Sequence, residues 1–116
     1  MTKRPVYVTI IGWLYIITGV LSAAYQIYQI QAQVNSFPYP LWPIELLVGL
    51  SAVIAGAYVL RGRNWARWLA LGWMAFHVAV SAFHSIAEAA MHLLFLAIIA
   101  WFLFRPAAKR YFQPTT

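Results

Sequence analysis

The chain has 116 residues, of which 64% are apolar and only 9% are charged, against about 25% charged residues in an ordinary soluble domain. So few charges cannot cover a water-facing surface, which favours an integral membrane protein over a soluble one. Eight Lys and Arg against two Asp and Glu give a net charge of +6, and the lack of cysteine excludes disulfides, thiol nucleophiles and cysteine-ligated metal clusters.

Four apolar segments, taken in chain order, are long enough to cross about 30 Å of hydrocarbon as helices. We predict them at about 5–29, 43–60, 65–84 and 86–104. Pro5 and Pro43 open the first two where a missing N–H costs nothing, and Pro106 stops the fourth. The predicted fold is therefore a single all-α transmembrane domain over residues 1–116, in which two helical hairpins form a four-helix bundle.

The positions of the basic residues predict the orientation of this bundle. Lys and Arg fall before the first segment, around the connection between the second and third, or after the fourth, whereas the connection between the first and second has no charge. By the positive-inside rule, both termini and the second connection lie in the cytoplasm. The side chains expected to contact lipid headgroups or a partner are Arg61, Arg63, Arg67, Arg105, Lys109 and Arg110. The aromatic side chains expected to anchor at the two interfaces are Tyr39, Trp42, Trp65, Trp68 and Tyr111.

A break is needed between the third and fourth segments. Residues 65–104 contain no proline, and as one helix they would be about 60 Å long, twice the hydrocarbon thickness. Ser85 and Glu88 form the S-x-x-E pattern of a capping box, so the fourth helix is predicted to begin after Ser85. Glu45 has an equivalent place near the start of the second segment, where its negative charge suits a helix N-terminus.

Small residues predict which segments touch. Gly12 and Gly19 are seven residues apart in the first segment, and small residues at helical spacing line the second, namely Gly49, Ala52 or Ala55, and Gly56. Small residues let the backbones of membrane helices approach closely, so the first two segments are expected to pack together.

The residues that invite a functional interpretation are His77, His84, Glu88 and His92. His77 and His92 are almost equally far from the predicted turn and should lie at the same depth. One interpretation is a set of interhelical hydrogen bonds that locks the two helices. A second is ligation of a metal ion by His77, His92 and Glu88, with His84 as a further candidate, or of a haem or chlorophyll-type pigment by one histidine. A third is proton relay in a transporter. Haem between both histidines is less favoured than the metal site, because packed helices are only about 8–10 Å apart.

Two stretches, RGRNWARWLAL at residues 61–71 and AWFLFRPAAKRYF at residues 100–112, resemble a diffuse group of small, uncharacterised four-helix bacterial inner-membrane proteins. Their recurring elements match residues 4–6, 62–67, 105–106 and 111–112 of this chain. The resemblance implies a multi-pass protein of the bacterial cytoplasmic (inner) membrane. It implies no activity and no site residues.

Neither a nucleophile elbow nor a glycine-rich phosphate loop occurs in the sequence, so we expect a protein that is not an enzyme. The expected role is that of an accessory or stabilising subunit of a larger membrane complex, with electron-transfer or photosynthetic assemblies as natural hosts. Its expected partners are membrane lipids and other membrane subunits, with no nucleic acid. The alternative is a small homo-oligomeric transporter or channel that uses the His/Glu cluster.

Overall fold

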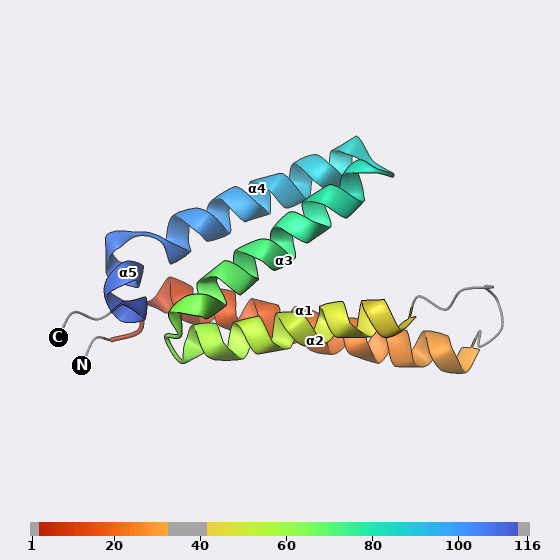
Figure 1. Cartoon of the computed structure of the whole chain (residues 1–116), viewed down its shortest axis with the longest axis horizontal. Helices are drawn as coiled ribbons and strands as arrows, with labels where there is room; N and C mark the ends of the chain where they lie inside the picture. The colour runs from red at the N-terminus through yellow and green to blue at the C-terminus, as the bar shows by residue number, and fades with distance from the viewer. Residues whose placement is uncertain (1–2, 33–41, 114–116) are drawn as a thin grey trace.

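The protein is seen in a computed structural model that describes residues 3–32 and 42–113. Five helices and no strand occur in these two ranges, which confirms the all-α prediction (Figure 1). The helices are α1 (Val6–Ala32), α2 (Trp42–Leu60), α3 (Asn64–Ala82), α4 (Ile86–Leu103) and α5 (Pro106–Phe112). The first four follow the predicted segments to within three residues at each end, whereas α5 was not predicted.

Three of the described helices are long and apolar enough to cross a membrane. The qualifying stretches are Val6–Tyr28, Pro43–Leu60 and Ile86–Leu103. α3 is not among them, because it includes Arg67, His77 and Ser81 among its 19 residues. The chain is therefore a helical protein with three candidate membrane spans.

α1 and α2 pack along each other through paired glycines. Gly12 faces Gly56 and Gly19 faces Gly49, so that the seven-residue spacing is matched in opposite chain directions. A Cβ atom added at Gly19 would lie 2.5 Å from the carbonyl oxygen of Gly49. The predicted contact between the first two segments is confirmed. The two backbones can approach this closely because glycine has no side chain to occupy the space between them.

The connection from α2 to α3 is a tight helix C-terminus built on Gly62. The Gly62 N–H donates to the Val59 carbonyl at 3.1 Å, and the Arg63 N–H donates to the Tyr58 carbonyl at 3.0 Å. This is the Schellman pattern, which needs a residue at positive φ, and Gly62 has φ +76°. α3 then begins directly at Asn64, which accepts hydrogen bonds from Arg67 rather than capping the helix.

The connection from α3 to α4 lies at residues 83–85, where the length argument required a break. Ser85 is extended, with φ −160°, and its hydroxyl oxygen accepts the Glu88 N–H at 3.2 Å. The serine half of the predicted capping box is thereby confirmed. The other half is not formed: the Glu88 carboxylate pairs with His84, and the Ser85 N–H donates to the Ser81 carbonyl.

α5 is a short helix at the end of the described chain, with Pro106 in its first turn. The proline ends α4, as expected, but it also starts α5, since a fixed φ and a missing N–H suit a first helical turn. Ala108 and Phe112 are buried on one side of α5. The helix thus continues the packed structure beyond Pro106, where no helix was predicted.

The helices are arranged as two pairs that meet at one end of the molecule and diverge toward the other (Figure 1). α1 lies along α2, and α3 lies along α4. The buried core is at the end where the pairs meet, near both termini. Its residues are Val8, Ile11, Tyr15, Ala52, Ala55, Val59, Ala66, Ala70, Leu103, Ala108 and Phe112. The far half of the α3–α4 pair therefore packs mainly on itself.

Candidate functional site

A group of polar side chains lies between α3 and α4 in the half of the pair away from the termini. We call His77, Ser81 and His92 the histidine seam. Ser81 is buried, with its hydroxyl 3.0 Å from Nδ1 of His92, while both imidazoles are half-buried. The ring centroids of His77 and His92 are 6.0 Å apart. The two histidines are level with each other, as counting residues from the turn predicted.

Each histidine of the seam is fixed by its own helix. Nδ1 of His77 lies 2.9 Å from the Trp73 carbonyl oxygen, and Nδ1 of His92 lies 2.9 Å from the Glu88 carbonyl oxygen. A carbonyl oxygen can only accept, so Nδ1 carries the hydrogen in both rings. In the neutral imidazole the lone pair is then on Nε2.

Trp73 completes the surroundings of His77 and was missed in the sequence. Its indole is 4.0 Å from the His77 ring, centroid to centroid, and its Nε1–H donates to the Val48 carbonyl of α2 at 2.8 Å. Trp73 is four residues before His77, a spacing that places two side chains on one helix face and could have shown the contact. The bond to Val48 also holds α3 against α2.

His84 and Glu88 form a separate pair at the exposed tip. Nε2 of His84 is 2.9 Å from a carboxylate oxygen of Glu88, and both side chains are more than half exposed. No group of three or more His, Asp or Glu side chains in the described ranges is close enough to hold a metal ion. The metal site considered for His77, His84, Glu88 and His92 together is therefore not formed, because the four divide into two separate pairs.

Arg67 is not the headgroup contact that the sequence analysis expected. It is only 2% exposed, and its Nη1 donates to the Leu103 carbonyl of α4 at 3.1 Å. Its guanidinium lies over the ring of Phe104 at 4.3 Å and that of Phe112 at 5.1 Å. A delocalised, weakly hydrated guanidinium is suited to such stacking. Arg67 therefore joins α3 to α4 and α5 instead of facing lipid headgroups.

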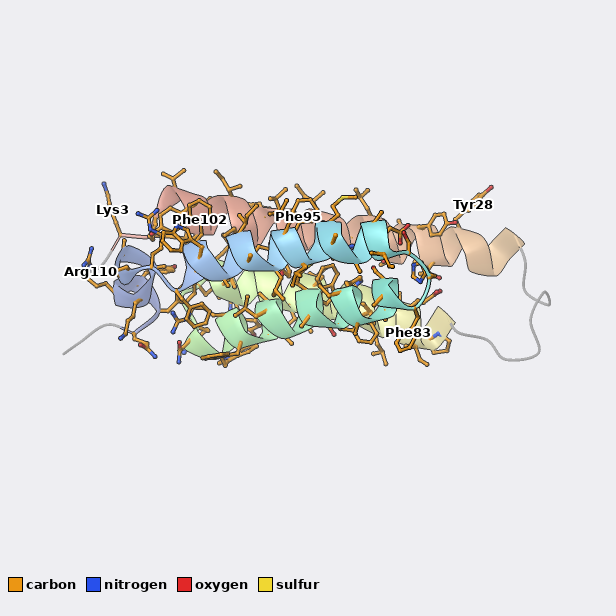
Figure 2. All side chains as sticks on the ribbon, turned by 90° about the horizontal axis from the view of Figure 1, so that it is seen from above. Lys3, Tyr28, Phe83, Phe95, Phe102 and Arg110 are labelled. Carbon is orange, nitrogen blue, oxygen red and sulfur yellow. The ribbon has the colours of Figure 1, made fainter. Side chains whose placement is uncertain are left out.

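The other basic residues are exposed and gather at the end where the helix pairs meet. Exposed members of the expected set are Arg61, Arg63, Arg105, Lys109 and Arg110. Lys3 and Arg110 lie at this end, and Phe83 lies toward the opposite end (Figure 2). The Leu60 carbonyl at the end of α2 accepts from Nη1 of Arg4 at 2.8 Å and from the hydroxyl of Tyr111. The N-terminal arm, the α2–α3 connection and α5 thus converge on one carbonyl group.

The remaining sequence-based assignments have mixed outcomes. Trp65 and Trp68 are exposed at the basic end, as interface anchors would be, whereas Tyr111 is half-buried and bonded to Leu60. Glu45 is in the first turn of α2, with an exposed side chain. Tyr39 and the side chain of Trp42 lie outside the described part of the structure.

Comparison of the chain with protein-family models, with curated proteins and with solved structures found no match. The resemblance to small four-helix inner-membrane proteins consequently stays a prediction.

Proposed function

We propose that the chain is a four-pass protein of the bacterial inner membrane that acts as an accessory subunit, packing through the α3–α4 pair against another membrane polypeptide. The observation that carries the proposal is the histidine seam itself. Two half-buried imidazoles lie about 8–9 Å below the outer ends of α3 and α4, taking 1.5 Å of rise per residue. Ionisable groups at that depth turn toward protein or water rather than lipid.

Membrane crossing by α3 follows from its pairing with α4. Only three residues, 83–85, separate the two helices, and Ser81 and His92 are in contact across them. If α4 crosses the bilayer, α3 has to cross beside it in the opposite direction. The polar side chains of α3 do not prevent this, because Arg67 and Trp73 are hydrogen-bonded to neighbouring helices.

The orientation proposed for this bundle has the basic end in the cytoplasm. The exposed Lys and Arg side chains described above lie at the end of the molecule that carries both termini. Cytoplasmic flanks of membrane helices are enriched in Lys and Arg, and such side chains attract anionic headgroups.

The surface of α4 supports an accessory role. Leu103 is the only buried residue among the 18 residues of this helix. Exposed apolar side chains include Leu94, Phe95, Ile98 and Trp101. Phe95 follows His92 by three residues, so an apolar surface adjoins the seam. A helix of a neighbouring subunit laid there would cover the imidazoles as well as the apolar side chains.

The transporter alternative has less support from the geometry. Glu45 and Glu88, the only carboxylate side chains in the sequence, are in the first turns of α2 and α4 and are exposed. Coupled transporters place their sites near the bilayer midplane, and neither glutamate is there.

Native mass measurement after mild detergent extraction tests the accessory role. The wild type is expected to co-purify with at least one other polypeptide. Phe95→Ala is expected to lose that polypeptide, whereas Leu21→Ala, at an exposed α1 position, is expected to keep it. A particle that contains only copies of this chain, for the wild type as well as for both variants, would contradict the proposal.

A further inference from the structure

The two imidazoles of the histidine seam have the form in which histidine binds metal ions. Metal-bound histidines usually donate their second ring N–H to a carbonyl or carboxylate, which fixes the tautomer and the ring orientation. Both His77 and His92 make this bond through Nδ1, at 2.9 Å from the carbonyls of Trp73 and Glu88. Both therefore have a free lone pair on Nε2, the atom that ligates.

The separation of the rings fits one shared ion. A Zn–N bond is about 2.0–2.1 Å, and the ring centre is about 1.1 Å behind the nitrogen, which puts each ring centre about 3.2 Å from the ion. Two such rings are about 5.2 Å apart at a tetrahedral angle and about 6.4 Å apart in a linear arrangement. The observed 6.0 Å lies between these limits.

Neighbouring aromatic side chains fix the orientation of the His77 ring. The Trp73 ring lies against the His77 ring at 4.0 Å, tilted by 37°, and Phe76 meets it edge-on at 5.6 Å. Trp73 is in turn anchored to α2 by its bond to Val48. A ligand whose orientation is fixed by packing and by a backbone hydrogen bond loses little freedom when an ion binds.

We propose that His77 and His92 bind one divalent transition-metal ion of the nitrogen-preferring class, Zn²⁺ or Cu²⁺, through their Nε2 atoms. Imidazole suits these ions, whereas Mg²⁺ and Ca²⁺ prefer oxygen ligands. The chain supplies two ligands, since Glu88 is engaged with His84. The remaining coordination positions are open to water or to a donor of the neighbouring subunit, and only that last point rests on the proposed function.

Substitution by asparagine separates metal ligation from structure. The amide N–H of asparagine can take the place of Nδ1–H toward the backbone carbonyl, but asparagine has no counterpart of Nε2. His77→Asn and His92→Asn therefore keep the local bond and remove the proposed ligand atom. His84→Asn is the matched control, because His84 is outside the seam.

The test is titration of the detergent-solubilised protein, purified through a tag without histidine, with Cu²⁺ alone and with Zn²⁺ alone. We expect one ion per chain, and pulsed electron paramagnetic resonance of the Cu²⁺ form should count two imidazoles. Each seam variant should show one imidazole and at least about a tenfold weaker affinity, the lower end of the loss seen when even an outer-shell partner is removed. His84→Asn should match the wild type.

The metal site would be overturned if both seam variants bound Cu²⁺ and Zn²⁺ as tightly as the wild type does. A single imidazole bound to Cu²⁺ in the wild type would also overturn it. The proposed function is tested separately. If the protein lacks this metal site but still co-purifies with a partner that is lost in Phe95→Ala, only the metal inference is wrong. A two-imidazole site in a particle made only of this chain supports the metal inference and removes the accessory role.

Discussion

Tyr7 and Tyr15 are two turns apart on α1 and differ in what their hydroxyl groups meet. Tyr15 is buried, and its hydroxyl donates to the Ala70 carbonyl of α3 at 2.7 Å. The hydroxyl of Tyr7 is also buried, but it has no hydrogen-bond partner in the described part of the chain. A buried hydroxyl stabilises a fold only when it is bonded, so the two tyrosines make opposite contributions.

Substitution of each tyrosine by phenylalanine should therefore have different effects. Tyr15→Phe removes a bond between α1 and α3 and should lower the free energy of unfolding by about 0.5–1.5 kcal/mol. Tyr7→Phe removes an unpaired hydroxyl and should leave the free energy of unfolding unchanged or raise it. Equilibrium denaturation in mixed micelles measures both. Equal losses in the two variants would show that the bond to Ala70 contributes nothing specific.

For single residues, the sequence predicted where a side chain lies along its helix better than it predicted which residues that side chain contacts. Counting from the turn placed His77 and His92 level, because helical rise is regular. Arg67 was misassigned because its charge was counted with the exposed basic residues, while its burial depends on Phe104 and Phe112, 37 and 45 residues further along. No local pattern reports such long-range stacking.

The helices themselves show which packing is tight and which is open. Gly19 is in the α1–α2 contact, where an added Cβ would lie 2.5 Å from Gly49 and Val53. Gly72, on α3, has nothing within 4 Å of the same added atom. Two helical glycines thus have opposite surroundings.

Alanine at these two positions should separate packing from helix propensity. Gly19→Ala forces α1 away from α2 and should destabilise the protein by about 1–3 kcal/mol, the usual cost of overpacking. Gly72→Ala adds no clash and should stabilise α3 by up to about 1 kcal/mol, because alanine is the better helix former. Thermal unfolding in detergent measures both changes. A stabilising effect at Gly19 would contradict the close contact of α1 and α2.

Hydropathy and turn signals predicted the first four helices well, since long apolar runs, prolines and Ser85 are local features. α5 was missed for a physical reason. Seven residues make a marginal helix alone, and α5 is stabilised by burial of Ala108 and Phe112 in the core. A short helix that depends on tertiary contacts leaves little trace in the sequence.

Over the whole molecule, the helix pairs meet at the basic end and diverge at the other (Figure 1). This divergence was not foreseen, because the sequence predicted two helical hairpins packed together as one bundle. The small residues that allow close packing of α3, Ala66 and Ala70, are in its first half. Beyond Trp73 the helix presents the histidine seam, and the buried core does not extend there.

The central claim is that α3 crosses the membrane beside α4, which gives four crossings rather than three. The native sequence has no cysteine, so single cysteines report their side cleanly. Arg63, just before α3, and Ala87, at the start of α4, are exposed positions at opposite ends of α3. With an impermeant thiol reagent on intact cells, our account predicts labelling of Ala87→Cys from outside and of Arg63→Cys only after the membrane is opened. Labelling of both cysteines from the same side would mean that α3 does not cross, and would contradict it.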